Sequence, residues 1–146
     1  PPLRSQRDRD ALRQALRDGV IDAICSDHAP VDDDAKERPF QESEPGATGV
    51  ELLLPLTLKW ADEAGLSLSQ ALDRVTRRPA TILGVESGVI AVGGPADLCI
   101  FDPAHAWTVS AKTLASLGKN SPFLGMEVFG RVRYTVIDGH VDFRAG

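Results

Sequence analysis

The residue best placed to do chemistry is Asp27, which follows the mostly apolar segment 20–25 after one serine. A carboxylate placed just after a buried strand faces any site at that edge of the sheet, where it binds a metal, acts as a general base, or does both. An aspartate after a strand more commonly caps the next turn, so position alone leaves these alternatives open. On an extended chain His28 points to the opposite face, which predicts a structural or supporting role.

The other candidate residues carry weaker signals. The acidic run at 32–34 suggests calcium, but it lacks the glycine and glutamate spacing of an EF-hand loop, so a solvated charge run is the better interpretation. His105 has no partner at metal-ligand spacing, and His140 follows a turn and is predicted to lie on the surface. Cys25 and Cys99 form no C-x-x-C pair, and Cys25 is predicted to be a small buried residue.

Helices and one strand must position these residues in the first part of the chain. Because residues 20–25 are apolar and β-branched without alternation, they predict a strand buried on both faces. A long polar loop follows, and loops of that length are usually functional or mobile. The spacing of apolar residues predicts helices over 8–18 and over 49–64, the second with a kink or its true start near Pro55. A third helix is predicted after the capping box of Ser67 and Gln70, and a short fourth helix from Pro79 to Leu83.

From residue 85 onward the pattern changes to strands and turns. Strands are predicted over 88–94, 96–102, 131–137 and 140–143, and Asp138-Gly139 is a strong signal for a two-residue hairpin turn. The chain therefore reads as α/β over 1–84 and mostly β over 85–146. A single strand cannot form a parallel sheet, since each neighbour needs its own crossover helix. Together with a start at Pro1 rather than Met, this predicts a piece of a longer protein.

The amino-acid composition indicates which classes of protein are expected and which are not. The 146 residues are 42% hydrophobic and 25% charged with a net charge of −5, as in an ordinary globular domain. The acidic balance argues against a nucleic-acid partner, which needs clustered Lys and Arg. No apolar run reaches the roughly 18 residues of a membrane span. Two cysteines and no visible signal peptide favour the cytoplasm.

Several motifs, taken in order, resemble the dihydroorotases of the amidohydrolase superfamily. The segments that carry the resemblance begin at residues 26, 44, 78, 88 and 120 and read SDHAP, EPGATGVELLLPL, RPATILG, GVIAVGGPADLCIFD and NSPFLG. The chain's start at 1–4 and its final hairpin match as well. The resemblance covers nearly the whole chain. It implies an α/β fold: residues 1–84 as the last strand and helices of a (β/α)8 TIM barrel, and 85–146 as the C-terminal part of a small β-sandwich.

The resemblance also implies an activity. Asp27 corresponds to the family's last-strand aspartate, which ligates zinc and shuttles a proton between the bridging hydroxide and the leaving amide nitrogen. Pro45 and Gly46 match the loop whose backbone touches the pyrimidine ring of the substrate. The implied reaction is the reversible cyclisation of N-carbamoyl-L-aspartate to L-dihydroorotate in pyrimidine biosynthesis. One or two Zn²⁺ ions are implied, and most of their ligands would precede this chain.

One position departs from the family pattern. The family reads D-H-A-P-H, and its last histidine helps hold the substrate carboxylate, whereas this chain has Val31. Losing a charge-assisted contact costs about 1.5–3 kcal/mol. Two alternatives therefore stay open: a non-catalytic scaffold for aspartate transcarbamoylase, and a cyclic amidase acting on a hydantoin or allantoin. We expect a homo-oligomer, and no activity from the 146 residues alone, because one carboxylate does not hold a catalytic zinc.

Overall fold

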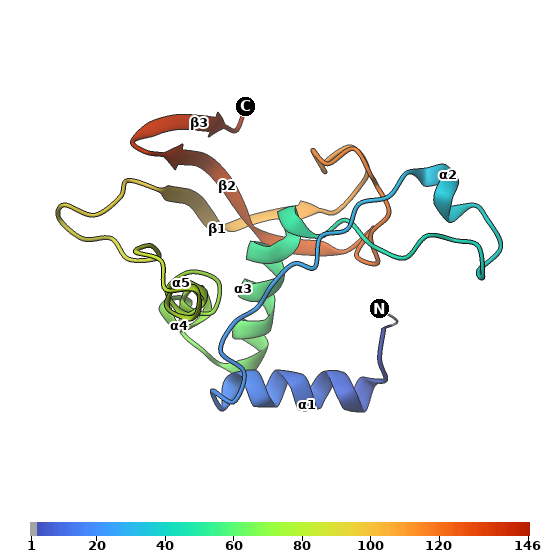
Figure 1. Cartoon of the computed structure of the whole chain (residues 1–146), viewed down its shortest axis with the longest axis horizontal. Coiled ribbons are helices and arrows are strands. Elements are labelled where there is room, and N and C mark those ends of the chain that lie inside the picture. Colours follow the sequence, from blue (N-terminus) through green and yellow to red (C-terminus); the bar gives the residue numbers. More distant parts are fainter. Residues whose placement is uncertain (1–2) are drawn as a thin grey trace.

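The computed structural model describes residues 3–146 and consists of helices packed beneath a small sheet (Figure 1). Pro1 and Pro2, the first residues of the family-like start, lie outside the described residues. The elements are α1 (Gln6–Arg17), α2 (Asp33–Lys36), the 3-10 helix η1 (Val50–Leu52), α3 (Leu53–Ala64), α4 (Leu68–Asp73), α5 (Arg77–Leu83), β1 (Leu98–Thr108), β2 (Glu127–Ile137) and β3 (His140–Arg144).

The sheet is a three-stranded antiparallel meander in the order β1-β2-β3. Strand β2 lies at its centre, with Leu98 opposite Val136 at one end of the β1 pairing and Thr108 opposite Glu127 at the other. The predicted turn between β2 and β3 is confirmed: Asp138 has φ 47° and Gly139 has φ 77°, the two positive values that a type I′ turn requires.

The helices begin and end where local signals place them. Ser5 and Ser67 each form a complete capping box, at the start of α1 and of α4. Gly65 and Gly84 end α3 and α5 in the left-handed conformation. Pro55 lies in the first turn of α3, where its missing N–H costs nothing, so the helix truly begins near it. The predicted helices are confirmed.

Two apolar clusters hold the molecule together. One joins α1, α3 and α4 through Leu16, Trp60, Ala61 and Ala71. The other joins the start of α3 to the sheet and its loops through Leu52, Val109, Leu114 and Val128. This second cluster contains residues from both sides of position 84, so the two halves share a core. The division at 84/85 stays a prediction.

Two predicted strands are not formed among residues 3–146. Residues 20–25 form no strand: the N–H groups of Val20 and Ile21 donate to Ala15 O at the end of α1, and the Ile24 N–H donates to Arg74 O at 3.0 Å. Residues 88–94 are also irregular, with Ile90 90% exposed. A strand exists only where a neighbour pairs with it, and among residues 3–146 neither segment has one. Cys25 is exposed, so its predicted burial is wrong as well.

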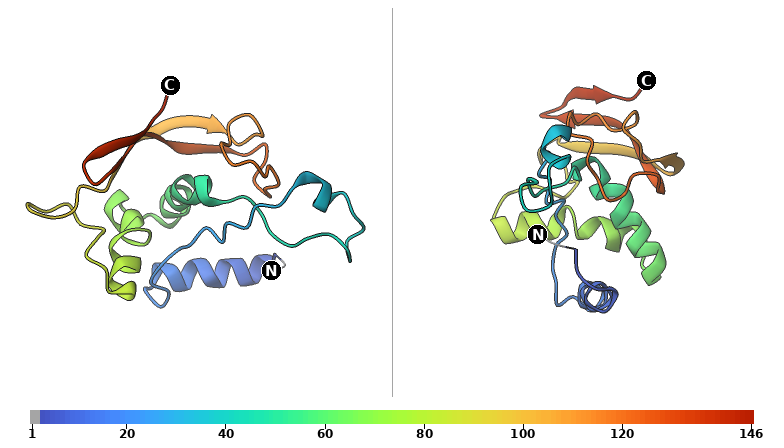
Figure 2. Two further views of the ribbon diagram at one scale, coloured as in Figure 1. Left: turned by 45° about the horizontal axis from the view of Figure 1, so that its top comes forward. Right: turned by 90° about the vertical axis from the view of Figure 1, so that its right-hand side faces the viewer.

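The arrangement in space is layered. Both views in Figure 2 place the sheet on one side and α1 on the other, with α3 between them. The segment that carries Asp27 runs from the α1 side toward α2, alongside the segment that leads into α3 (Figure 1). Over residues 3–146, none of the helices combines the length and the apolar character needed to cross a bilayer.

Candidate functional site

Asp27 lies in a segment without regular structure and has an unusual backbone. Its φ is 45°, in the left-handed region that non-glycine residues adopt rarely and aspartate adopts more readily than most. Its side chain is exposed. Two residues further on, the Ala29 N–H donates to Ala47 O at 3.0 Å, so the 26–31 segment runs beside the 45–49 segment.

Gly46 is where these two segments approach most closely. Its φ is 129°, and a Cβ built there would collide with the carbonyl oxygen of Ala29. Only glycine fits such a conformation and such an approach. At Gly49 a Cβ would lie 2.9 Å from Ser26 O, again too close. The structure therefore brings the backbone of Pro45 and Gly46 beside the Asp27 segment, as a shared site requires.

A third segment closes the arrangement, and sequence reasoning did not assign it a role. Asn120 donates from Nδ2 to Gly46 O at 3.1 Å and accepts from the Thr48 N–H at 2.7 Å. The buried Thr48 hydroxyl donates to Gly118 O at 2.6 Å. Asn120 and Gly46 are 74 residues apart. Asn120 belongs to a motif noted in the sequence, but no spacing rule could pair it with Gly46.

His28 ties the Asp27 segment to the start of the long helix. Its Nδ1 accepts from the Gly49 N–H at 3.1 Å and from the Val50 N–H at 3.2 Å. These amides stand at the beginning of η1, where helical N–H groups lack intrahelical partners. The ring is half-buried. This geometry agrees with the predicted structural role of His28.

Glu51 fastens the same helix start to the loop after β1. Its carboxylate accepts from the Ala115 N–H at 2.8 Å, the Ser116 N–H at 2.9 Å and the Ser116 hydroxyl at 2.7 Å. Burial raises the pKa of Glu51, but these hydrogen bonds and the charge of Lys119 outweigh it, so the pKa lies below its ordinary value. Glu51 is a structural anchor that sequence reasoning missed.

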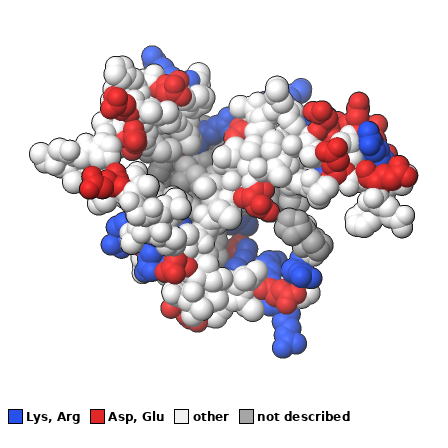
Figure 3. Space-filling model, viewed as in Figure 1, with Lys and Arg blue, Asp and Glu red and all other residues white. Residues whose placement is uncertain are grey.

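Asp27 fits a metal as one ligand among several. An exposed carboxylate oxygen is a suitable ligand for Zn²⁺. Across residues 3–146, however, no three His, Cys, Asp or Glu side chains cluster closely enough to hold an ion. The acidic run at 32–34 is exposed at the start of α2, within the patch of acidic side chains that Figure 3 shows at that end of the molecule.

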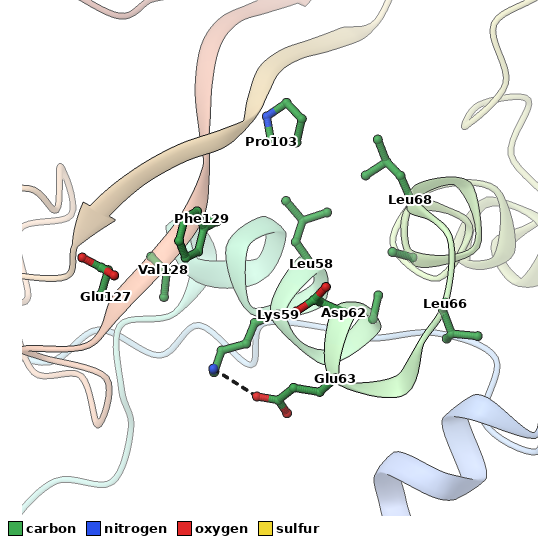
Figure 4. Close-up of a pocket in the computed structure, with 12 residues that line it drawn as sticks. Leu58, Lys59, Asp62, Glu63, Leu66, Leu68, Pro103, Glu127, Val128 and Phe129 are labelled. Carbon is green, nitrogen blue, oxygen red and sulfur yellow. Dashed lines mark ion pairs between the residues drawn. The ribbon is translucent and has the colours of Figure 1, made fainter.

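Two cavities flank α3, and they differ in their relation to Asp27. One, of about 350 Å³, lies between α1, the segment 20–25 and α3, and Ser26 and Gly49 are among its lining residues. The other, of about 470 Å³, lies between α3, α4 and the sheet (Figure 4). Its rim carries the Lys59–Glu63 ion pair at 3.0 Å, and it contains none of the predicted site residues. Only the first cavity adjoins the candidate site.

Comparisons with known proteins place this geometry in context. A family model described as "Amidohydrolase family" matches residues 2–141. A dihydroorotase of Geobacter sp. strain M21 is 45% identical over 100% of this chain and 34% of its own length. A "dihydroorotase-like protein" of Pseudomonas aeruginosa is 47% identical over 97% of this chain and 33% of its own length. The chain thus spans about a third of the length of these curated relatives.

Solved structures show the same partial match. The D-hydantoinase of a Bacillus sp. AR9 superimposes with a TM-score of 0.89 at 32% identity, over 99% of this chain and 33% of that one. The dihydropyrimidinase of Brevibacillus agri NCHU1002 also gives 0.89, at 30% identity and the same coverage. The arrangement described above is therefore similar to about a third of a larger known fold.

Proposed function

The chain belongs to the amidohydrolase family, and on that premise we propose that it is the C-terminal part of a dihydroorotase. The reaction is the reversible cyclisation of N-carbamoyl-L-aspartate to L-dihydroorotate, a step of pyrimidine biosynthesis. The observation that carries this proposal is the likeness, over nearly the whole chain, to several proteins named dihydroorotase.

In the proposed mechanism Asp27 is the proton-transfer group. It accepts the proton of the attacking water and returns it to the amide nitrogen as the ring opens, so the carboxylate is regenerated in each cycle. Its exposure leaves the carboxylate oxygens accessible to a substrate. The backbone of Pro45 and Gly46 contacts the ring of the substrate, and the absence of a side chain at Gly46 permits that approach.

Zinc is the proposed cofactor, and Asp27 is its proposed ligand from this chain. When bound, the metal supplies Lewis acidity that lowers the pKa of water to about 7. A catalytic zinc has about three protein ligands. The proposal therefore needs further ligands from other parts of a longer polypeptide.

The proposed architecture gives the segment 20–25 a role. We propose that 20–25 is the last strand of a (β/α)8 barrel, that the rest of 1–84 forms its final helices, and that 85–146 belongs to a β-sandwich. The segment has no regular structure and no strand neighbour among residues 3–146, and an apolar cavity adjoins it. Such features are expected of a strand whose neighbours lie in other parts of a barrel.

Val31 favours a second candidate function, a cyclic amidase that acts on a hydantoin or another ring without the carboxylate. Valine offers neither charge nor hydrogen bond to a substrate carboxylate. The match to D-hydantoinase and dihydropyrimidinase structures is compatible with this alternative. A scaffold without turnover, bound to aspartate transcarbamoylase, is the remaining alternative.

The test is an assay of the full-length protein on dihydroorotate and on hydantoin, with zinc content measured in parallel. Faster turnover of dihydroorotate supports the proposal, and faster turnover of hydantoin supports the second candidate. Absence of both, with no bound zinc, supports the scaffold. The 146-residue chain alone is expected to turn over neither substrate, since its described residues offer one candidate ligand.

A further inference from the structure

The backbone turn at Asp27 is held from outside rather than by its own side chain. The residue keeps φ at 45° although its side chain is exposed, so packing around the carboxylate does not impose this conformation. Left-handed conformations of non-glycine residues cost about 1–3 kcal/mol and persist where the surroundings over-determine them. Some contact close to Asp27 must supply that constraint.

The adjacent residue makes such a contact. His28 places one ring nitrogen against two amides, those of Gly49 and Val50. A nitrogen that accepts from N–H groups carries no proton itself, so in the neutral ring the proton is on Nε2. The two amides are donors at a helix start, where N–H groups lack intrahelical partners. The Ala29 N–H, bonded to Ala47 O, fixes the next residue.

We propose that His28 is the positioning residue of Asp27. By accepting from the start of η1 through Nδ1, the ring fixes the backbone immediately after Asp27 and keeps that residue left-handed, which sets the direction of its carboxylate. The inference rests on the proposed function only where it gives the direction of the Asp27 carboxylate a catalytic purpose. The effect of His28 on the backbone of Asp27 does not depend on that function.

Two substitutions distinguish the role of the hydrogen-bond acceptor Nδ1 from that of the size of the ring. His28→Asn keeps a carbonyl oxygen on the γ carbon, where Nδ1 is attached, whereas His28→Gln moves the oxygen one bond further out. In crystal structures of the full-length variants, Asp27 is expected to keep a positive φ in His28→Asn and to lose it in His28→Gln. Hydrogen exchange at Gly49 and Val50 is expected to accelerate roughly fivefold in His28→Gln alone. His140→Ala, at the exposed start of β3, is the matched control.

Steady-state kinetics distinguish a positioning role from a merely structural one, because only a positioning role predicts a change in kcat without a change in KM. In an active wild type, His28→Gln is expected to lower kcat about 10²-fold with KM unchanged, and His28→Asn to restore kcat. An unchanged Asp27 φ in His28→Gln would overturn the proposal, as would His28→Asn behaving like His28→Gln. If His28→Gln does not fold, His28→Ala takes its place: loss of the positive φ at Asp27 supports the proposal, and a retained positive φ overturns it. If the wild-type protein shows no turnover, the proposed function is contradicted, but the φ of Asp27 in the variants still tests the role of His28.

Discussion

Two aspartates adopt the same rare backbone conformation for different reasons. Asp27 and Asp138 are the two non-glycine residues with positive φ among residues 3–146, at 45° and 47°. Asp138 belongs to the hairpin turn between β2 and β3, where Gly139 follows it and its N–H donates to Asp97 Oδ1 at 2.8 Å. Asp27 has no hairpin around it, and its neighbours are fixed by residues more than 15 positions away.

The comparison shows what each conformation serves. At Asp138 the left-handed backbone reverses the chain, and the Asp-Gly pair alone predicts it. Asp27 lies outside the sheet, and its conformation forms no hairpin turn. Tertiary contacts impose this conformation, which orients an exposed carboxylate. Backbone strain held by distant contacts is typical of functional positions.

The largest expected effect comes from replacing each aspartate by asparagine. Asparagine tolerates the left-handed region as aspartate does, so both variants should fold. Asp27→Asn removes the proton-transfer group and is expected to reduce dihydroorotate turnover by the full-length protein about 10²–10⁴-fold. Asp138→Asn is expected to keep the wild-type rate. Steady-state kinetics on the two proteins measure the contrast, and equal rates would remove Asp27 from the mechanism.

Replacing the neighbouring glycines by alanine comes next. Gly46→Ala adds a Cβ that collides with the carbonyl of Ala29, and is expected to cost more than about 2 kcal/mol in the free energy of unfolding. At Gly139 the nearest atom to a Cβ, Ala96 Cβ, is 4.0 Å away, so Gly139→Ala carries backbone strain of about 1 kcal/mol. Urea denaturation of both variants gives the difference. Equal losses would mean that the contact at Ala29 is not tight.

The smallest expected effect concerns the anchor beside the site. Because hydrogen bonds hold the pKa of Glu51 low, its carboxylate stabilises the fold above the pKa of the unfolded chain, and this contribution is lost as the pH falls through the folded pKa. Glu51→Gln is expected to cost about 1–2 kcal/mol at neutral pH and less in acid.

Glu63→Gln is the matched control for that anchor. The pKa of Glu63 is also lowered, chiefly by its hydrogen bond with Lys59, but both side chains are exposed to solvent. Its substitution is expected to cost below about 0.5 kcal/mol. Thermal unfolding from pH 4 to pH 7 follows both proteins. A difference between Glu51→Gln and wild type that stays constant from pH 4 to pH 7 would show that the ionised carboxylate of Glu51 does not supply the stability.

The sequence by itself determined the features that depend on neighbouring residues. The sequence predicted the cap at Ser67, the glycines that end α3 and α5, the start of α3 near Pro55 and the Asp138-Gly139 turn, because each follows from a few adjacent side chains and their allowed φ values. The motifs also placed Asp27, Pro45 and Gly46 in one candidate site. Its catalytic and metal-binding roles stay predictions.

Tertiary structure decided everything that needs a distant partner. The segments 20–25 and 88–94 have the composition of strands, but strand pairing is a long-range interaction, and residues 3–146 supply no neighbour for either. Likewise, the Gly46 carbonyl meets Asn120, and Nδ1 of His28 meets the start of η1, only because the chain folds those segments together. Capping and turn rules depend on residues a few positions apart. These contacts instead join residues that are far apart in the sequence and become neighbours only in the folded protein.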